Sequence, residues 1–211
     1  MKIFLAIPTI NKLYPDMVKA LFEINKNTEH EITLRFISSQ PTDVVRNKLV
    51  EEFLETDCEV LWFMDDDAIP PVDILSLLEG NVFDVIAPLT YIYQEHNLIP
   101  NLWMIDGKKK SVKKTDGKQL EKVDACGMGC VFIGRNVFEG MEKPYFKFVT
   151  NVNHNTLLES ETFYFFKKVK ELDYNVYVNP RMNCGHVKHM NLDLVAYQMS
   201  KAVKNYKGRT E

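Results

Sequence analysis

The chain has 211 residues, of which 45% are apolar, 26% charged and 11% aromatic. This composition fits one sizeable α/β domain and excludes a disordered chain. The formal net charge of −3 gives no overall attraction to nucleic acids or membranes, so any such contact must be local.

The first third of the chain alternates strand and helix patterns. In chain order we expect a strand over 2–7, a helix over 16–25, a strand over 31–37, a helix from 42 to about 54 and a strand over 59–64. Met17, Val18, Leu21 and Phe22 are expected on the inward face of the first helix, and Thr42 is expected to cap the second. The unbroken apolar run of the third strand is typical of a central parallel strand. Short links between these elements predict a parallel, right-handed sheet.

Two further elements complete this alternation, and the pattern changes after them. A short helix is expected after Pro70 and Pro71, and a strand over 82–89. Two Asp-Gly pairs within Asn101–Lys118 predict one or two hairpins that project from the sheet. The elements expected after them are a strand over 130–133, a helix over 159–172, a strand over 174–178 and a polar helical tail.

The N-terminus and the cysteines bear on the compartment. Met1–Pro8 is apolar for about six residues only, too few for a secretory signal. The sequence has no apolar stretch near the roughly 20 residues that cross a bilayer, so we expect a cytoplasmic protein. Cys126 and Cys130 are separated by three residues with no second pair nearby, so buried thiols are favoured over a zinc site.

The strongest chemical signal is the run Asp65-Asp66-Asp67, which directly follows a buried strand. Open α/β sheets bind their ligands at this end of their strands. Adjacent carboxylates repel one another, and a divalent cation among them relieves the repulsion. Mg²⁺ and Mn²⁺ suit such oxygen ligands and commonly bind a substrate diphosphate as well. Alternation along an extended chain places Asp65 and Asp67 on one side and Asp66 on the other.

Arg46 is the second signal. Val45, Leu49, Val50 and Phe53 mark the inward arc of their helix, and Arg46 falls within that arc. A guanidinium that points inward needs an anionic partner. That partner is either an internal carboxylate or a bound nucleotide.

The segment Val45-Arg46-Asn47, a helix, and then a strand that ends in Asp65-Asp66-Asp67 resembles the nucleotide half of GT-A-fold glycosyltransferases with an Asp-x-Asp motif. The resemblance implies a GT-A-like α/β fold with a Rossmann-like, mostly parallel sheet, flanking helices and an inserted hairpin region. It implies that Pro8 and Thr9 contact the nucleobase, and that Arg46 and Asp66 belong to the donor site. By the same resemblance Asp65 reaches the ribose or the metal, and Asp67 binds the metal.

The second half resembles the same family more loosely. Gly127 and Gly129 match its Gly-rich segment beside the donor sugar. Glu161-Thr162 stands where family members carry Glu-Asp, whose aspartate is usually the general base of inverting enzymes. Because Thr162 cannot act as that base, Glu161 or Glu159 is expected to replace it, and the stereochemistry stays open.

A histidine after the last strand completes the metal or diphosphate site in that family, and His186 matches it, with His189 as a competitor. The resemblance covers roughly residues 2–188. It implies one glycosyltransferase domain over 1–211, divided into a nucleotide-binding half (1–90), an acceptor and sugar half (91–190) and a helical tail (191–211). The metal is expected to be Mn²⁺ or Mg²⁺, and a UDP-sugar is the favoured donor.

The acceptor is the least defined feature. Six lysines lie within Lys108–Lys118, which suggests either a solvated turn or contact with a phosphate-rich acceptor such as nucleic acid or a polymer. A modified DNA base is one such candidate. Trp103 and Asp124 are assigned to the acceptor side, and Tyr91 or Tyr93 is a further candidate for stacking.

Two other functions remain open. Sugar nucleotidyltransferases share this fold, but their Gly-rich loop after the first strand is absent from Pro8-Thr9-Ile10-Asn11-Lys12. A catalytically inactive carbohydrate- or nucleotide-binding module is the other alternative, and Thr162 is the residue that favours it.

Overall fold

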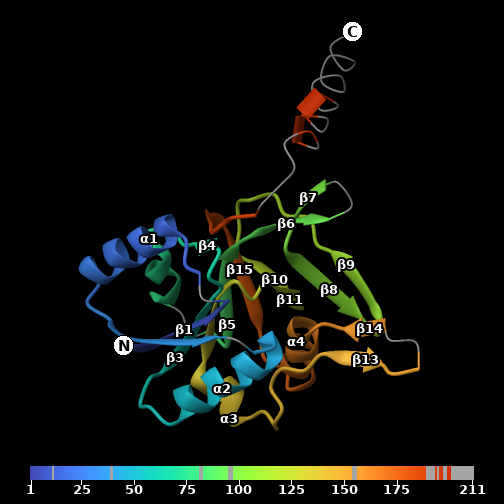
Figure 1. Cartoon of the computed structure of the whole chain (residues 1–211), viewed down its shortest axis with the longest axis horizontal. Helices are drawn as coiled ribbons and strands as arrows, with labels where there is room; N and C mark the ends of the chain where they lie inside the picture. Colours follow the sequence, from blue (N-terminus) through green and yellow to red (C-terminus); the bar gives the residue numbers. More distant parts are fainter. Residues whose placement is uncertain are drawn as a thin grey trace.

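The computed structural model describes residues 1–10, 12–38, 40–80, 83–94, 97–153, 156–188, 193, 195–196 and 199–200. Its centre is a seven-stranded sheet in the order β10-β15-β5-β12-β3-β1-β2 (Figure 1). The strands are β1 (Lys2–Thr9), β2 (Glu31–Ser38), β3 (Val60–Met64), β5 (Val85–Leu89), β10 (Glu121–Val123), β12 (Cys130–Gly134) and β15 (Val176–Asn183). The pairings give β2, β1, β3, β5 and β15 one direction, while β12 and β10 run against them.

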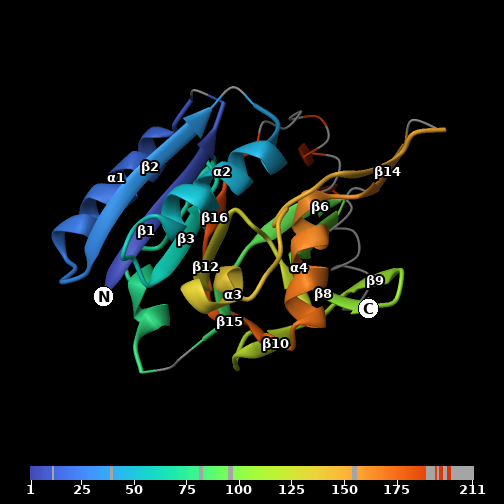
Figure 2. The same cartoon turned by 90° about the horizontal axis from the view of Figure 1, so that it is seen from below.

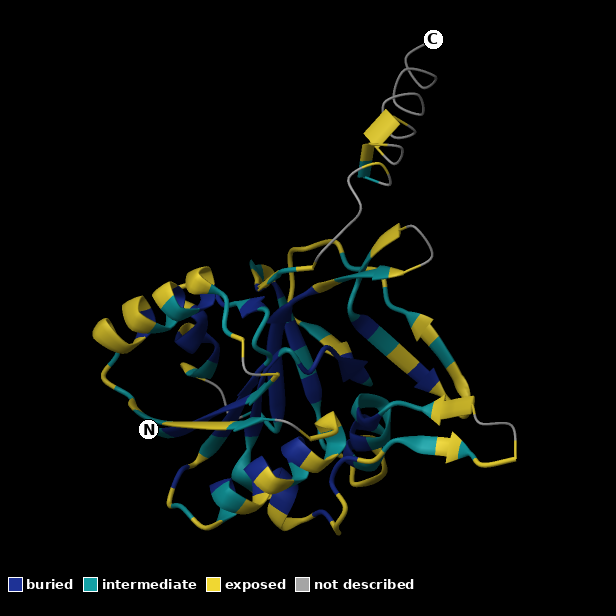
Figure 3. Ribbon diagram, in the orientation of Figure 1, coloured by how far each residue is buried: buried dark blue, intermediate teal, exposed yellow. Residues whose placement is uncertain are grey.

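Helices cover both faces of this sheet. One face packs against α2 (Thr42–Leu54), α3 (Arg135–Glu139) and α4 (Glu161–Glu171), as the view from below shows (Figure 2). The other face packs against α1 (Pro15–Lys26) and the 3-10 helix η1 (Ile74–Leu78). Alternate residues of each strand enter the two cores: Phe63 joins the first and Trp62 the second, both fully buried. Figure 3 shows this burial concentrated in the central strands.

Short antiparallel ladders stand beside the main sheet. They are β6 (Tyr91–Gln94) with β7 (Asn97–Pro100), β8 (Leu102–Asp106) with β9 (Lys109–Val112) and β11 (Ala125–Cys126), β13 (Val149–Asn151) with β14 (Thr156–Glu159), and β4 (Ala68–Ile69) with β16 (Gly185–His186). The β8–β9 hairpin turns at Gly107 and Lys108, where Gly107 has a φ of 56° that glycine adopts readily.

The predicted fold class, a mostly parallel α/β sheet flanked by helices with an inserted hairpin region, is confirmed. Each element expected in the first third is present within two residues of its predicted bounds. The strand expected over 82–89 begins at Val85, and residues 81–82 lie outside the described part of the chain. The expected tail lies mostly outside it too, although residues 193, 195, 196, 199 and 200 are helical. In the part that the structure describes, no helix is long and apolar enough to cross a membrane.

Several details of the sequence prediction were wrong. Thr42 is the first residue of α2, not its cap, because Pro41 holds the extended cap position and no side chain caps the helix. On α1 the buried residues are Met17, Ala20 and Ile24, whereas Phe22 is 72% exposed. The strand β3 is central and parallel to β1, as expected, and only its other neighbour, β12, runs antiparallel to it.

The second Asp-Gly pair also behaves differently from the first. Gly117 makes a turn with a φ of 74°, but the strand that follows it, β10, pairs with β15 and not with β9. This region therefore contains one hairpin. The hairpin β6–β7, which carries no Asp-Gly signal, was not predicted.

Candidate functional site

One edge of the sheet collects nearly all of the candidate residues. Strands β1, β3, β5 and β15 end there, which brings Thr9, Asp65 and Thr90 to the same side. The strand β12 runs the other way, so Gly129 before its start reaches this edge as well. Asp65 N donates to the carbonyl of Gly129 at 2.9 Å, which ties the two strand ends together. This is the edge at which open α/β sheets bind ligands.

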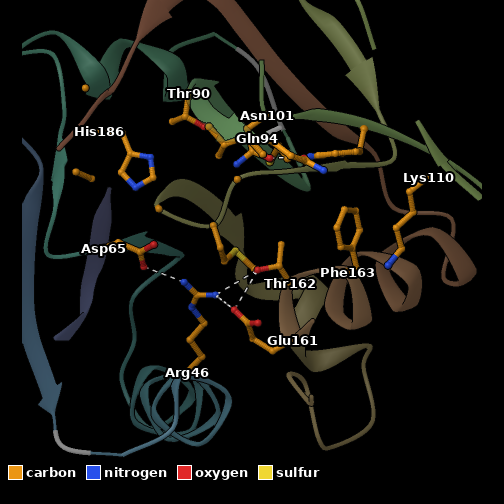
Figure 4. Close-up of a pocket in the computed structure, with 18 residues that line it drawn as sticks. Arg46, Asp65, Thr90, Gln94, Asn101, Lys110, Glu161, Thr162, Phe163 and His186 are labelled. Carbon is orange, nitrogen blue, oxygen red and sulfur yellow. Dashed lines mark hydrogen bonds and ion pairs between the residues drawn. The ribbon is translucent and has the colours of Figure 1, made fainter. Parts of the chain in front are cut away.

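Arg46 lies at the centre of this edge, 3% exposed, on the first turns of α2. Its Nη1 donates to Glu161 Oε1 at 2.6 Å and its Nη2 to Asp65 Oδ1 at 2.8 Å, as Figure 4 shows. A longer contact of 3.4 Å runs from Nη1 to Thr162 Oγ1. Internal carboxylates are therefore its partners in this structure. Nε of Arg46 is buried and has no hydrogen-bond partner among the described residues.

Glu161 reaches Arg46 because it begins α4. Ser160 caps this helix, its side chain accepting a hydrogen bond from the backbone N of Phe163. A carboxylate in the first turn is favoured by the helix dipole. Glu161 is 8% exposed and Thr162 Oγ1 donates to it at 3.1 Å. The helix N-terminus, the guanidinium and the hydroxyl together hold this carboxylate in one position.

The three consecutive aspartates have three different sets of partners. Asp65 bonds Arg46, while Asp66 accepts from Thr9 Oγ1 at 2.8 Å and from the backbone N of Ile10 at 2.9 Å. Asp67 pairs with His186 and Lys188. The side chains of the three aspartates therefore do not alternate as they would in a strand. The strand ends at Met64 and the chain then turns, with Ala68 N donating to the carbonyl of Asp65. All three aspartates line the same cavity, so the expectation that Asp66 faces away from the other two was wrong.

The pair of Asp67 and His186 is the most perturbed part of the site. His186 Nε2 lies 3.3 Å from Asp67 Oδ1, and Lys188 Nζ lies 2.5 Å from Asp67 Oδ2. Burial raises the pKa of Asp67, but the hydrogen bonds from His186 and Lys188 outweigh burial and lower it to about 2. The hydrogen bond to Asp67 in turn raises the pKa of His186. His186 Nδ1 lies 3.2 Å from the carbonyl of Tyr91, so both of its ring nitrogens have partners.

Lys188 was missed by the sequence analysis, although its position two residues after His186 was visible there. A single lysine after the last predicted strand carries no sequence signal of a functional role. Only the pairing of β16 with β4 brings it to Asp67, whose carbonyl accepts from the backbone N of Val187. The competitor His189 lies outside the described residues.

The predicted metal ligands Asp65, Asp67 and His186 are not gathered around one point. Asp67 and His186 pair with each other, whereas Asp65 pairs with Arg46. Within the described ranges no group of three His, Cys, Asp or Glu side chains is placed to hold a metal ion.

Two cavities meet at this edge. The smaller, about 280 Å³, is lined by Pro8, Thr9, Ile10, Gln40, Thr42, Val45, Arg46, Asp65, Asp66, Asp67, Glu161 and Lys188. The larger, about 600 Å³, extends towards the β8–β9 hairpin and includes His186 and Phe163 in its wall (Figure 4). Trp103 lines it as well. Arg46, Asp65 and Glu161 line both cavities. This ion-paired cluster is thus the boundary between a charged space and a mostly neutral one.

Gly127 and Gly129 both line the larger cavity. A Cβ added at Gly127 would lie 2.4 Å from Asn101 Nδ2 and 2.8 Å from Thr90 Oγ1, and one added at Gly129 would lie 3.1 Å from Asp65 Oδ2. The absence of a side chain at these two positions therefore keeps the cavity wall open. Cys126 lies beside them, where burial raises the pKa of its thiol to about 12. This supports a structural thiol there.

Other candidates lie away from the cavities. Glu159 pairs with Lys110 and Lys167, and it does not line either cavity, unlike Glu161. Asp124 accepts from Ile105 N at 2.7 Å and pairs with Lys170, which ties the hairpin to α4.

The lysines of the hairpin region do not form one cluster. Lys110 and Lys113 are half-buried and paired with Glu159 and Glu121, while Lys108, Lys109, Lys114 and Lys118 are exposed. Tyr91 and Tyr93 line a third cavity of about 590 Å³, whose lining also includes His186 and Lys188.

No protein-family model matches the chain, and a search of curated proteins finds no significant match. Among solved structures, A197 from STIV matches with a TM-score of 0.62 and 22% identity, over 90% of this chain and 87% of that one. A UDP-glucose pyrophosphorylase complexed with UDP-glucose matches with a TM-score of 0.49 and 8% identity, over 97% and 100% of the two chains. The inositol-1-phosphate CTP transferase from T. maritima matches with a TM-score of 0.47 and 12% identity, over 95% and 96%. The first likeness establishes a shared fold, and the other two are too distant to bear on function.

Proposed function

We propose that this chain is a glycosyltransferase that moves a sugar from a nucleotide-diphosphate sugar, a UDP-sugar in first place, to an acceptor. The observation that carries the proposal is the meeting of two cavities at Arg46, Asp65 and Glu161. Transfer between two substrates needs two adjoining spaces with the reacting atoms at their boundary. The chain's resemblance to GT-A-fold enzymes with an Asp-x-Asp motif agrees with this division.

The smaller cavity is the proposed donor site. Pro8 and Thr9 are proposed to contact the base, and Asp66, held by Thr9 and Ile10, fixes that loop against the aspartate run. The diphosphate then lies among Arg46, Lys188 and the aspartates. Lys188 and Arg46 are cations that stabilise negative charge on a departing diphosphate.

We propose that a divalent cation binds here only together with the donor, since the described side chains do not form a metal site by themselves. Mg²⁺ and Mn²⁺ are commonly held by one or two carboxylates together with substrate phosphates, and Asp65 and Asp67 both line the cavity. His186, already paired with Asp67, is placed to orient that carboxylate more directly than to bind the metal. When bound, the cation neutralises the charge of the leaving diphosphate.

The larger cavity is the proposed site of the sugar and the acceptor. Of the two carboxylates that line it, Asp65 and Glu161, Glu161 is the proposed base, taking the proton of the acceptor hydroxyl as that oxygen bonds the sugar carbon and the diphosphate leaves. Arg46 and Thr162 orient this carboxylate. Gly127 and Gly129 allow the sugar to approach the backbone.

Calorimetric titration of UDP- and GDP-sugars, with and without Mn²⁺, followed by a hydrolysis assay, tests the proposal. We expect donor binding that requires the metal and that Asp67→Ala abolishes, together with slow hydrolysis of the bound donor. Absence of binding by any nucleotide would overturn the proposal. Donor binding without hydrolysis or transfer would instead favour the inactive binding module.

Sugar nucleotidyl transfer is the second candidate, and it shares the nucleotide-sugar site. Incubation with a sugar 1-phosphate and UTP or CTP separates it from glycosyl transfer. Release of pyrophosphate would establish nucleotidyl transfer, and we expect none.

A further inference from the structure

The larger cavity ends at a lysine of the β8–β9 hairpin. Lys110 lines this cavity, and its Nζ lies 3.8 Å from the centroid of the Phe163 ring. Phe163 meets Trp103 edge to face with the centroids 5.5 Å apart. Figure 4 shows Phe163 between Thr162 and Lys110, with Asp65 on the opposite side. A wall of two aromatic rings thus leads from the ion-paired cluster to an ammonium group.

The charge at this end is positive. Lys110 Nζ lies 3.2 Å from Glu159 Oε1, and Lys167 Nζ lies 2.7 Å from the same oxygen. Two ammonium groups therefore share one carboxylate, which leaves a formal charge of about +1. The Lys110 side chain is 22% exposed, so its amine is partly shielded from water and keeps N–H donors for a ligand.

The wall between the two ends is neutral. Thr90, Gln94 and Asn101 contribute a hydroxyl and two amides to it. Such groups form hydrogen bonds with sugar hydroxyls, and the ring of Trp103 offers an apolar surface beside them. The negative groups of the cavity, Asp65 and Glu161, are at the other end and are paired with Arg46.

We propose that this end of the larger cavity binds a saccharide acceptor that carries a carboxylate or a phosphate, and that Lys110 selects for that charge. The inference rests on the proposed function, because it names the acceptor class of the same site. The saccharide lies along Trp103 and Phe163, and its anionic group pairs with the ammonium of Lys110. Lys167 remains to neutralise Glu159 when Lys110 turns towards the ligand.

Lys109 provides a matched control. It precedes Lys110 on β9, so its side chain points to the opposite face of the hairpin. Lys109 is exposed and does not line the cavity. Lys109→Gln and Lys110→Gln remove the same charge from the same strand, but only the second changes the cavity.

The test is an array of neutral, uronic-acid-bearing and phosphate-bearing oligosaccharides, probed without donor with the wild type, Lys110→Gln and Lys109→Gln. A duplex DNA is included as a separate arm. We expect binding of acidic members, of either the carboxylate or the phosphate type, in preference to neutral ones. The apparent affinity should fall about tenfold or more in Lys110→Gln, as for loss of a hydrogen bond to a charged group, and stay unchanged in Lys109→Gln.

Three results would overturn the inference: equal binding of neutral and acidic members, unchanged binding by Lys110→Gln, or no saccharide bound. Tight binding of DNA that both lysine variants weaken equally would also overturn it, because the contact would then lie on the exposed lysines. Calorimetric titration of UDP into the same proteins separates the two proposals. If UDP binds and the array shows no acid preference, only the acceptor inference fails; if no nucleotide binds, the donor site itself is wrong.

Discussion

The two cavities that meet at Arg46 are built from different parts of the molecule. The smaller is lined by residues that follow the parallel strands β1 and β3, and by the start of α2, and its carboxylates are all paired. The larger is lined largely by the hairpins, the segment before β12 and the start of α4, and its polar groups are neutral apart from the ion-paired cluster, His186 and Lys110. The proposed divalent cation, together with Arg46 and Lys188, suits the smaller cavity to a diphosphate, and amides and aromatic rings suit the larger one to a sugar. Variants that affect one cavity and leave the other unchanged test whether the two have separate roles.

The largest effect is expected at the boundary itself. Arg46→Ala leaves Glu161 and Asp65 without their shared cation, and removing one partner of a buried ion pair costs about 3–5 kcal/mol of unfolding free energy. Arg35, exposed and 3.7 Å from Glu52, is the control, since Arg35→Ala should cost about 1 kcal/mol or less. Urea unfolding measures both. Equal losses of unfolding free energy in the two variants would show that the ion-paired cluster does not stabilise this part of the fold.

A second variant separates the cavities sterically. Gly127→Ala places a methyl group against Asn101 and Thr90 in the larger cavity, at an expected stability cost of about 1–3 kcal/mol. We expect UDP to bind as in the wild type while the added affinity of a UDP-sugar is lost. Gly129→Ala, whose methyl group faces Asp65 at the boundary of both cavities, should weaken UDP as well as the sugar. Calorimetry with UDP and with a UDP-sugar measures these affinities. If Gly127→Ala weakens UDP and Gly129→Ala does not, the proposed roles of the two cavities are wrong.

The charged cavity should also respond to acid. The pKa of Asp67 is about 2, below its ordinary value of 3.8, so its pairs stabilise the fold above pH 4 and are lost as the pH falls towards 2. Because the group is only half-buried, we expect a contribution of about 1 kcal/mol. Chemical unfolding from pH 5 to 2.5, without metal, should show a smaller loss of stability in Asp67→Asn than in the wild type. The exposed Asp73→Asn serves as control, and an identical slope in all three proteins would contradict the assignment.

The smallest effect is expected within the neutral wall. Trp103 Nε1 donates to Asn101 Oδ1 at 2.7 Å, and Trp103→Phe removes that hydrogen bond while it keeps an aromatic ring beside Phe163. We expect a loss of about 0.5–1.5 kcal/mol in unfolding free energy and no change in UDP affinity. Thermal unfolding and calorimetry test this. A change in UDP affinity would show that the two cavities are not independent.

The parallel half of the fold was predictable because its signals are local. Apolar runs such as 59–64 and amphipathic helices such as 42–54 specify their own structure, and short links fix the direction of the strands. The β6–β7 hairpin has no Asp-Gly turn, and the pairing of β10 with β15 joins residues about 55 positions apart. Neither the hairpin nor this pairing can be predicted from a short stretch of sequence.

For the site, the sequence alone determined that Arg46 points inward and that a run of carboxylates follows a buried strand. It left open whether Arg46 pairs with an internal carboxylate or with a ligand, and only the tertiary structure brought Glu161, 115 residues later, to within 2.6 Å of it. The same holds for the contact of Lys188 with Asp67 and of Lys110 with Phe163, since each joins elements from distant parts of the chain. Periodicity determines which face of an element a residue occupies, but the partner on the other side is decided by the packing of whole elements.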